Sequence, residues 1–176
     1  RIVWLCLPRL DSPAMFAELL GGPNAGYFSI APAEGAARAR QRYSGSSMVL
    51  QTLWKNMRVT DFLDGSRGKF EQRAGRSDLL RIIEGSGRAI VEFAPRLDFG
   101  REPTRLQARE GGLVIANTHD PIVLRAPGVA WKIIERGEHH TARAEIDLGD
   151  EPLALTLCYG TGSLRQESVP ALDRLR

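Results

Sequence analysis

The apolar positions at the start of the chain predict one buried strand followed by one short helix. Residues 2–7 are apolar on both faces, as expected of a strand that is covered on both sides. Asp11 and Ser12 can cap a helix, and Pro13 suits its first turn. We therefore predict a helix over residues 13–20, which Gly21-Gly22-Pro23 ends.

From Tyr27 onward, apolar positions alternate with polar ones, a period that is typical of β-strands. The clearest case is residues 141–148, whose alternation predicts one buried and one solvated face. The predicted strands that follow the helix are residues 27–31, 38–43, 48–54, 57–63, 79–84, 89–94, 104–109, 113–117, 122–126, 129–135, 141–148 and 153–159.

Turn sequences separate these strands at roughly ten-residue intervals. Lys55-Asn56, Gly85-Ser86-Gly87, Gly111-Gly112 and Pro127-Gly128 each predict a hairpin-type connection between neighbours. Long helices do not alternate with the strands, which argues against a parallel sheet. The sequence therefore predicts an all-β fold: an antiparallel sandwich with one short helix near the N-terminus.

The tetrapeptide Pro-Arg-Leu-Asp occurs twice, at residues 8–11 and 95–98, each time after an apolar stretch. Proline ends ladder pairing on its N–H side, and residues two apart in extended backbone project to the same side. Each copy can therefore hold an ion pair, Arg9 with Asp11 and Arg96 with Asp98. Such a pair either fixes a loop or presents a charged group to a ligand or a neighbouring domain.

Composition narrows the classes of partner. The 24 basic and 21 acidic side chains are spread along the 176 residues, which argues against a nucleic-acid binder. No apolar run approaches the roughly 18 residues that cross a bilayer. Neither a metal-ligand spacing nor a secretion leader is visible. We expect no cofactor, no metal and a cytoplasmic location, although the strand pattern already present at Arg1 suggests residues upstream and leaves secretion open.

Few residues suggest catalysis. His139 and His140 would point to opposite faces of a strand and so could not chelate one metal ion together, and His119 lies in a turn sequence. Cys6 and Cys158 lie in apolar stretches that predict buried thiols, with a disulfide left open. The carboxylates available for glycosidase-like chemistry are Asp11, Asp61, Asp64, Glu84, Glu92 and Asp98. Trp4, Trp54 and Trp131 could stack on sugar rings, although Trp54 and Trp131 are expected in the core.

Several segments resemble, in the same order, the N-terminal region of glycoside hydrolase family 15 proteins of the bacterial glucoamylase and trehalase type. The opening WLCLPRLDSPAMFAELLGG is similar to the N-terminal signature of that family, with Leu10 where Phe is usual. Further similar segments are YFSIAP, QRY, RVTDF, VEFAPRLDFG and LTLCYG. The resemblance extends over nearly the whole chain.

This resemblance implies an antiparallel β-super-sandwich over residues 1–162 and a linker over residues 163–176 toward an (α/α)6 barrel. In the family, the barrel carries both catalytic glutamates. The resemblance therefore implies that this chain holds no catalytic residue and is inactive when isolated. It also implies that the partner of the chain is the barrel of the same polypeptide, and that this barrel binds the α-glucoside substrate. The implied function is a non-catalytic domain that braces the barrel of an α-glucosidic hydrolase.

Of the two tetrapeptides, the first is the better candidate for a contact with a ligand or a neighbouring domain. Arg9, Asp11 and Ser12 directly follow a buried strand, and Trp4 is nearby in that strand. We hypothesise that this loop faces the barrel or its sugar, while Arg96 and Asp98 form a structural pair. Two alternatives stay open: an autonomous carbohydrate-binding module, for which 7% aromatic residues is a low content, and a mutarotase-type sandwich enzyme, which would need a histidine and a carboxylate across one face.

Overall fold

A computed structural model describes residues 1–34, 38–64 and 78–165, and within these ranges the chain forms an antiparallel β-sandwich. An N-terminal hairpin pairs β1 (Trp4–Cys6) with β2 (Ala14–Ala17). The larger sheet has the order β4 (Arg40–Tyr43), β5 (Leu50–Leu53), β6 (Met57–Asp64), β7 (Asp78–Gly85), β14 (Leu153–Tyr159), β11 (Ile122–Arg125), β10 (Gly112–Ala116) and β9 (Arg105–Arg109). The smaller sheet has the order β12 (Lys132–Arg136), β13 (His139–Leu148), β8 (Gly87–Ala94) and β3 (Tyr27–Pro32).

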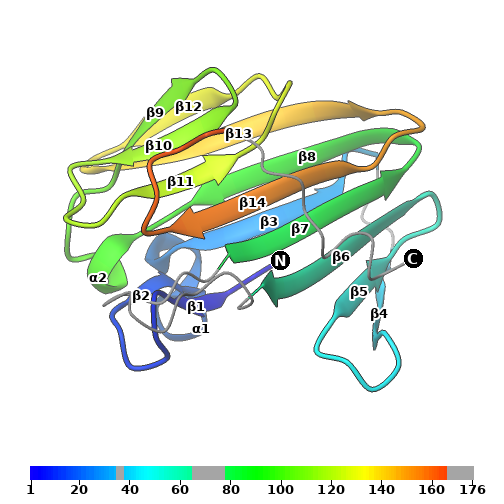
Figure 1. Cartoon of the computed structure of the whole chain (residues 1–176), viewed down its shortest axis with the longest axis horizontal. Helices are drawn as coiled ribbons and strands as arrows, with labels where there is room; N and C mark the ends of the chain where they lie inside the picture. The colour runs from blue at the N-terminus through cyan, green and yellow to red at the C-terminus, as the bar shows by residue number, and fades with distance from the viewer. Residues whose placement is uncertain (35–37, 65–77, 166–176) are drawn as a thin grey trace.

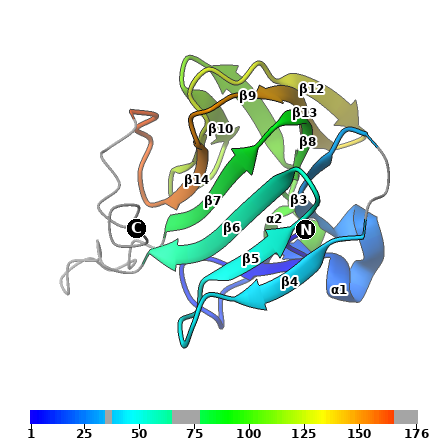
Figure 2. The same ribbon diagram turned by 90° about the vertical axis from the view of Figure 1, so that its right-hand side faces the viewer.

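The larger sheet curves around the smaller one, and the core fills the space between them (Figure 1 and Figure 2). Alternate residues of facing strands supply this core, for example Val91 of β8, Ala142 of β13 and Leu155 of β14, each fully buried. The predicted all-β sandwich is confirmed, and the twelve strands predicted after the helix correspond in order to β3–β14. Their ends differ from the prediction by a few residues.

The predicted helix over residues 13–20 is wrong in its first half. Ala14–Ala17 form strand β2, and only Glu18–Gly21 are α-helical, as α1, before a 3₁₀ turn over Gly22–Ala25. All four residues of β2 are buried, and a short run that is buried on every side has the same sequence pattern in a helix and in a strand. The backbone groups of β1 decided the outcome, because they pair with β2.

Two of the four predicted hairpin connections join the two sheets instead. Lys55-Asn56 and Gly111-Gly112 connect hydrogen-bonded neighbours, as predicted. Gly85-Ser86-Gly87 leads from β7 in the larger sheet to β8 in the smaller sheet, and Pro127-Gly128 leads from β11 to β12 in the same way. Turn residues favour a chain reversal, but they do not determine whether the next strand pairs in the same sheet or packs against it from the other.

Aromatic packing attaches the N-terminal hairpin to the sandwich. Phe16 of β2 packs 6.3 Å from Phe28 and 6.0 Å from Phe93, and the last two rings lie 5.2 Å apart, all measured between ring centroids. All three side chains are fully buried. The hairpin is therefore held by the core of the smaller sheet, which fixes the position of the turn at its tip.

Candidate functional site

The first Pro-Arg-Leu-Asp segment forms the turn between β1 and β2. The Arg9 guanidinium donates to both carboxylate oxygens of Asp11, at 2.9 Å from Nε and 3.0 Å from Nη2. Ser12 closes the turn, because its backbone N–H donates to the Arg9 carbonyl at 3.1 Å and its hydroxyl accepts from the Arg9 N–H at 3.3 Å. The Arg9–Asp11 pair predicted from the sequence is thus confirmed as a contact. It is also exposed, with 74% and 69% of the two side chains accessible to solvent.

Exposed apolar side chains gather around this turn. The Trp4 ring of β1 lies at a tilt to the Phe99 ring, with 6.2 Å between the ring centroids, and the two residues are 38% and 39% exposed. Among the described residues, eight large hydrophobic side chains are exposed, and five of them belong to β1, the turn, α1 and the turn at Phe99. We call this set the end patch: Trp4, Leu10, Leu19, Leu20 and Phe99. Figure 1 shows these elements together at the lower left of the sandwich.

The second Pro-Arg-Leu-Asp segment is built differently, and the predicted Arg96–Asp98 pair is wrong. Arg96 is buried and donates to the Pro95 carbonyl at 2.7 Å, the His140 carbonyl at 3.0 Å and the Thr141 hydroxyl at 3.0 Å. Burial lowers the pKa of this guanidinium from its usual value. Asp98 lies 3.9 Å from Arg101 instead.

The reason for this error is the backbone conformation after Arg96. Leu97–Gly100 form the short helical element α2, in which Asp98 has a φ of 47° and Phe99 a φ of 57°. The same-side rule for residues two apart holds only in extended backbone. The left-handed turn directs Asp98 away from Arg96 and places Phe99 on Trp4.

The two tetrapeptide segments are neighbours in space. The Arg96 backbone N–H donates to the Met15 carbonyl of β2 at 2.9 Å, and Leu97 is fixed by a 3.1 Å bond from its N–H to the Thr104 hydroxyl. The second copy is thus an internal support, and it positions the hairpin whose tip is the first copy. Sequence reasoning gave no sign that the two copies touch, and the role of the first copy in contacting a ligand or a neighbouring domain stays a prediction.

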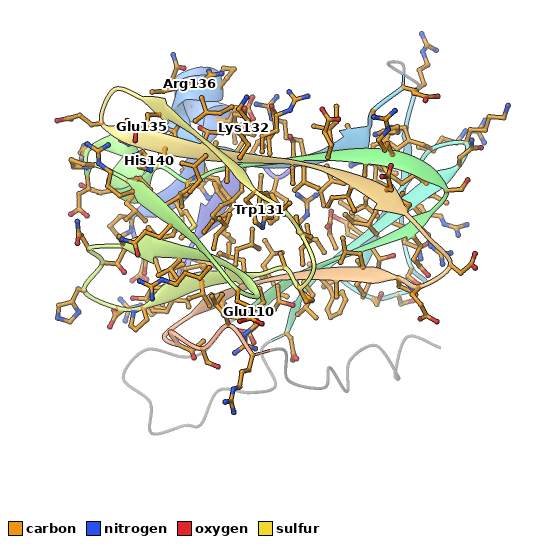
Figure 3. The ribbon with its side chains drawn as sticks, turned by 90° about the horizontal axis from the view of Figure 1, so that it is seen from above. Glu110, Trp131, Lys132, Glu135, Arg136 and His140 are labelled. Atoms are coloured by element: carbon orange, nitrogen blue, oxygen red, sulfur yellow. The ribbon has the colours of Figure 1, made fainter. Side chains whose placement is uncertain are left out.

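The His140 side chain lies in a cluster of polar side chains that the sequence analysis did not predict. It is 12% exposed and lies between the edges of the two sheets, where Nε2 is 2.9 Å from Arg105 Nη1 and 3.6 Å from Glu135 Oε1 (Figure 3). The Leu106 N–H and carbonyl lie 3.2 and 3.4 Å from Nδ1. Both ring nitrogens are therefore engaged by protein groups, and the ring links the sheets rather than facing a substrate.

The other two histidines are not part of this cluster. His139 pairs across the strand with Arg136, so the expectation that His139 and His140 face opposite ways is confirmed. His119 is almost fully exposed beside Asp120, in the turn where it was predicted. In the described ranges, no group of three histidine, cysteine or acidic side chains is arranged to hold a metal ion.

Asp120 accepts a hydrogen bond from the Tyr159 hydroxyl, which joins the turn after β10 to the end of β14. Burial and this bond raise the pKa of Tyr159 to about 12, and the same bond lowers the pKa of Asp120. The phenol of the unfolded chain ionises at its usual value of 10, so the unfolded state loses this proton first. Stability from neutral Tyr159 is therefore complete below pH 10 and is lost as the pH rises toward 12.

We expect that Tyr159→Phe removes the decrease in the free energy of unfolding that ionisation of Tyr159 causes between pH 10 and pH 12. The measurement is urea unfolding of both proteins at several pH values between 10 and 12. Tyr43→Phe is the matched control, because Tyr43 is 60% exposed in β4 and should leave the profile unchanged. Identical profiles for the Tyr159 variant and the parent protein would show that the contact does not govern this range.

Most of the candidate glycosidase carboxylates lie next to an arginine side chain. Five of the six lie within 4 Å of an arginine: Asp11 with Arg9, Asp61 with Arg81, Glu84 with Arg58, Glu92 with Arg143 and Asp98 with Arg101. The sixth, Asp64, is buried opposite Asp78 across β6 and β7. The five arginine contacts explain these five carboxylates as structural ion pairs.

The remaining sequence expectations concern cysteines and tryptophans. Cys6 and Cys158 are both buried, unbridged thiols, which closes the question of a disulfide between them, and burial raises the pKa of Cys6. Trp54 and Trp131 are half-buried and pack against the main core, as expected. The helices of the described residues are all too short or too polar to cross a bilayer.

Fold and site together define an antiparallel β-sandwich domain with an exposed apolar end, and the comparisons name its family. A family model for the trehalase-like N-terminal domain matches residues 1–176. The chain belongs to this trehalase-like N-terminal family.

Curated trehalases match the same region. Trehalase 2 of Sulfolobus acidocaldarius is 28% identical over 118 residues, which are 66% of this chain and 19% of that protein. A trehalase of Thermoplasma volcanium is 28% identical over 131 residues, or 69% of this chain and 20% of that protein. A trehalase of Mycolicibacterium smegmatis is 39% identical over 54 residues, which are 31% of this chain and 8% of that protein. The chain thus spans about a fifth or less of the length of these relatives.

Proposed function

We propose that this chain is the non-catalytic N-terminal domain of a longer α-glucosidic glycoside hydrolase of the trehalase or glucoamylase type. The observation that carries the proposal is the match of the whole chain to the trehalase-like N-terminal family, while it corresponds to only about 20% of the trehalases. The engagement of the candidate carboxylates by arginines supports a role without chemistry of its own. Residues 163–176 would act as the linker to the catalytic barrel; of these, only residues 163–165 are among those described.

The bracing surface in this proposal is the N-terminal end of the sandwich. The end patch is apolar, and large exposed apolar areas on soluble domains are typical of interaction sites. The Arg9–Asp11 pair stands beside it with most of both side chains in solvent, where it can exchange water for polar groups of a partner. The turn at residues 8–12, with Trp4, would then face the barrel or the sugar that the barrel holds.

Glucose release from trehalose and from a malto-oligosaccharide tests the proposed function. We expect no release by the 176-residue chain and release by a polypeptide extended at its C-terminus, with the preferred sugar identifying the substrate. Release by the short chain would overturn the proposal and would return attention to Asp11, Asp61, Asp98 and His119. An extended polypeptide that folds and releases glucose from neither sugar would also contradict it.

Replacing Arg9 and Asp11 together by alanine in the extended polypeptide tests the proposed role of the loop. Because the pair is exposed, we expect a stability loss below about 1 kcal/mol by urea unfolding, together with a measurable change in kcat or KM. The control is Gln107→Ala with Arg109→Ala, an exposed hydrogen-bonded pair on β9 that should change neither. Unchanged kinetics and unchanged stability would refute the contact role, and unchanged kinetics with lower stability would leave a structural pair.

A further inference from the structure

The end of the sandwich opposite to the N-terminal hairpin carries a hollow that the proposed function does not use. It lies where the β5–β6 turn, the β7–β8 connection and the end of β3 meet, at the right-hand side of Figure 1. Its volume is about 200 Å³, which is below the about 300 to 1,000 Å³ that is usual for pockets of drug-sized ligands. The lining residues are Pro32, Glu34, Trp54, Lys55, Asn56, Met57, Ser86, Gly87 and Arg88.

Backbone contacts fix the walls of this hollow. The Trp54 N–H donates to the Met57 carbonyl at 2.8 Å and closes the β5–β6 turn, and the Ser86 N–H donates to the Asn56 carbonyl at 2.9 Å. At Gly85, with a φ of 131°, a side chain would place its Cβ 2.1 Å from that same Asn56 carbonyl oxygen. The two connections are thus packed together so closely that only glycine fits, and the hollow is pre-formed.

The lining combines one aromatic wall with groups that both donate and accept hydrogen bonds. Trp54 is half-buried and lines the hollow together with Asn56 and Ser86, which are exposed. An amide and a hydroxyl each offer a donor and an acceptor. A ligand that suits these three groups needs an apolar face for the indole and hydroxyls on its rim.

The charges around the hollow argue against an anionic ligand. Arg88 is shared with two carboxylates of β13, because Nη1 lies 3.8 Å from Glu145 and Nε lies 3.7 Å from Asp147. Glu34 is the one acidic residue of the lining, against the cations Arg88 and Lys55. Together with Glu145 and Asp147, which lie beside Arg88, three carboxylates stand against two cations in or next to the hollow. A phosphate or carboxylate would meet no net positive site here, whereas uncharged hydroxyls can accept from the cations and donate to Glu34.

We propose that this hollow is a binding site for a neutral saccharide, with room for one pyranose ring beside Trp54. A pyranose ring presents C–H groups on its faces and hydroxyls around its rim, which matches the indole wall and the polar lining. The inference is independent of the catalytic barrel, because every lining group belongs to this chain. A shallow one-ring site should bind weakly, with a Kd on the order of 1 mM.

Two-dimensional amide NMR of the 176-residue chain tests the site, with glucose and trehalose added to about 50 mM. We expect saturable shifts of the Lys55, Asn56 and Ser86 amides and of the Trp54 indole N–H, and no such shifts with inorganic phosphate. The variants Lys55→Ala and Arg88→Ala, both on exposed side chains, should weaken binding at least several-fold without unfolding the protein. Trp54→Phe should weaken it further.

Trp131→Phe is the matched control, because Trp131 is also a half-buried indole packed on the main core but does not line the hollow. It should bind both sugars as the parent chain does. Absence of saturable shifts in the folded chain would overturn the proposal, as would equal shifts with phosphate or equal binding by the Lys55 and Arg88 variants. Because no catalysis is measured, these outcomes are distinct from failure of the proposed hydrolase function.

Discussion

Replacing Asp61 by alanine should lower the free energy of unfolding by about 3 to 5 kcal/mol. Asp61 in β6 accepts two hydrogen bonds from Arg81 in β7, from Nε at 2.8 Å and from Nη2 at 3.2 Å. The third donor, Nη1, reaches the Phe28 carbonyl of the opposite sheet at 2.7 Å. The Arg81 side chain is 1% exposed, so the variant would leave a buried guanidinium without its counter-charge.

The same two strands provide a matched control. Arg58 in β6 and Glu84 in β7 also pair across the strands, at 2.8 Å, but their side chains are 44% and 31% exposed. Glu84→Ala should cost no more than about 1 kcal/mol, since solvent can replace the partner. Urea unfolding of both variants measures the difference, and similar losses for the two would contradict the argument from burial. Arg81→Met with Asp61→Leu should recover much of the loss, because an apolar pair leaves no buried charge.

The second large effect should come from Phe16→Ala, with a loss of about 3 to 5 kcal/mol. Phe16 is fully buried and contacts both Phe28 and Phe93, so the variant removes one ring from a group of three. The surrounding groups belong to a different sheet and cannot all collapse into the space. Leu20→Ala, in the exposed end patch, is the control and should change stability by less than about 0.5 kcal/mol.

This variant also tests how the candidate site is supported. Phe16 anchors the hairpin that carries Trp4 and the turn with Arg9 and Asp11. At low urea, where the protein stays folded, hydrogen exchange of the β1 and β2 amides should rise more than that of β8. Uniform acceleration across all three strands would mean that the hairpin and the sandwich open together, and that Phe16 does not hold the hairpin specifically.

The two tetrapeptides show which side-chain contacts residue spacing can predict and which it cannot. The first tetrapeptide forms its ion pair, because Arg9 and Asp11 are close in sequence and both side chains are free to orient in solvent. The second has the same four residues, yet Arg96 is directed into the protein by His140 and Thr141, which lie more than forty residues away. Local sequence gives no information about such distant partners.

The sequence by itself determined the class of fold, the order of the strands from β3 to β14 and the positions of the turns, because alternation and glycine-rich turns are local properties of the chain. It also determined family membership, through ordered similar segments. Only the tertiary structure decided which strands share a sheet, since β7 and β8 separate at Gly85–Gly87 to face each other across the core. The same long-range packing made Ala14–Ala17 a strand, buried Arg81 beside Asp61, and brought Trp54 and Ser86 together around one hollow. These outcomes depend on contacts between residues far apart in sequence, and side-chain periodicity does not encode them.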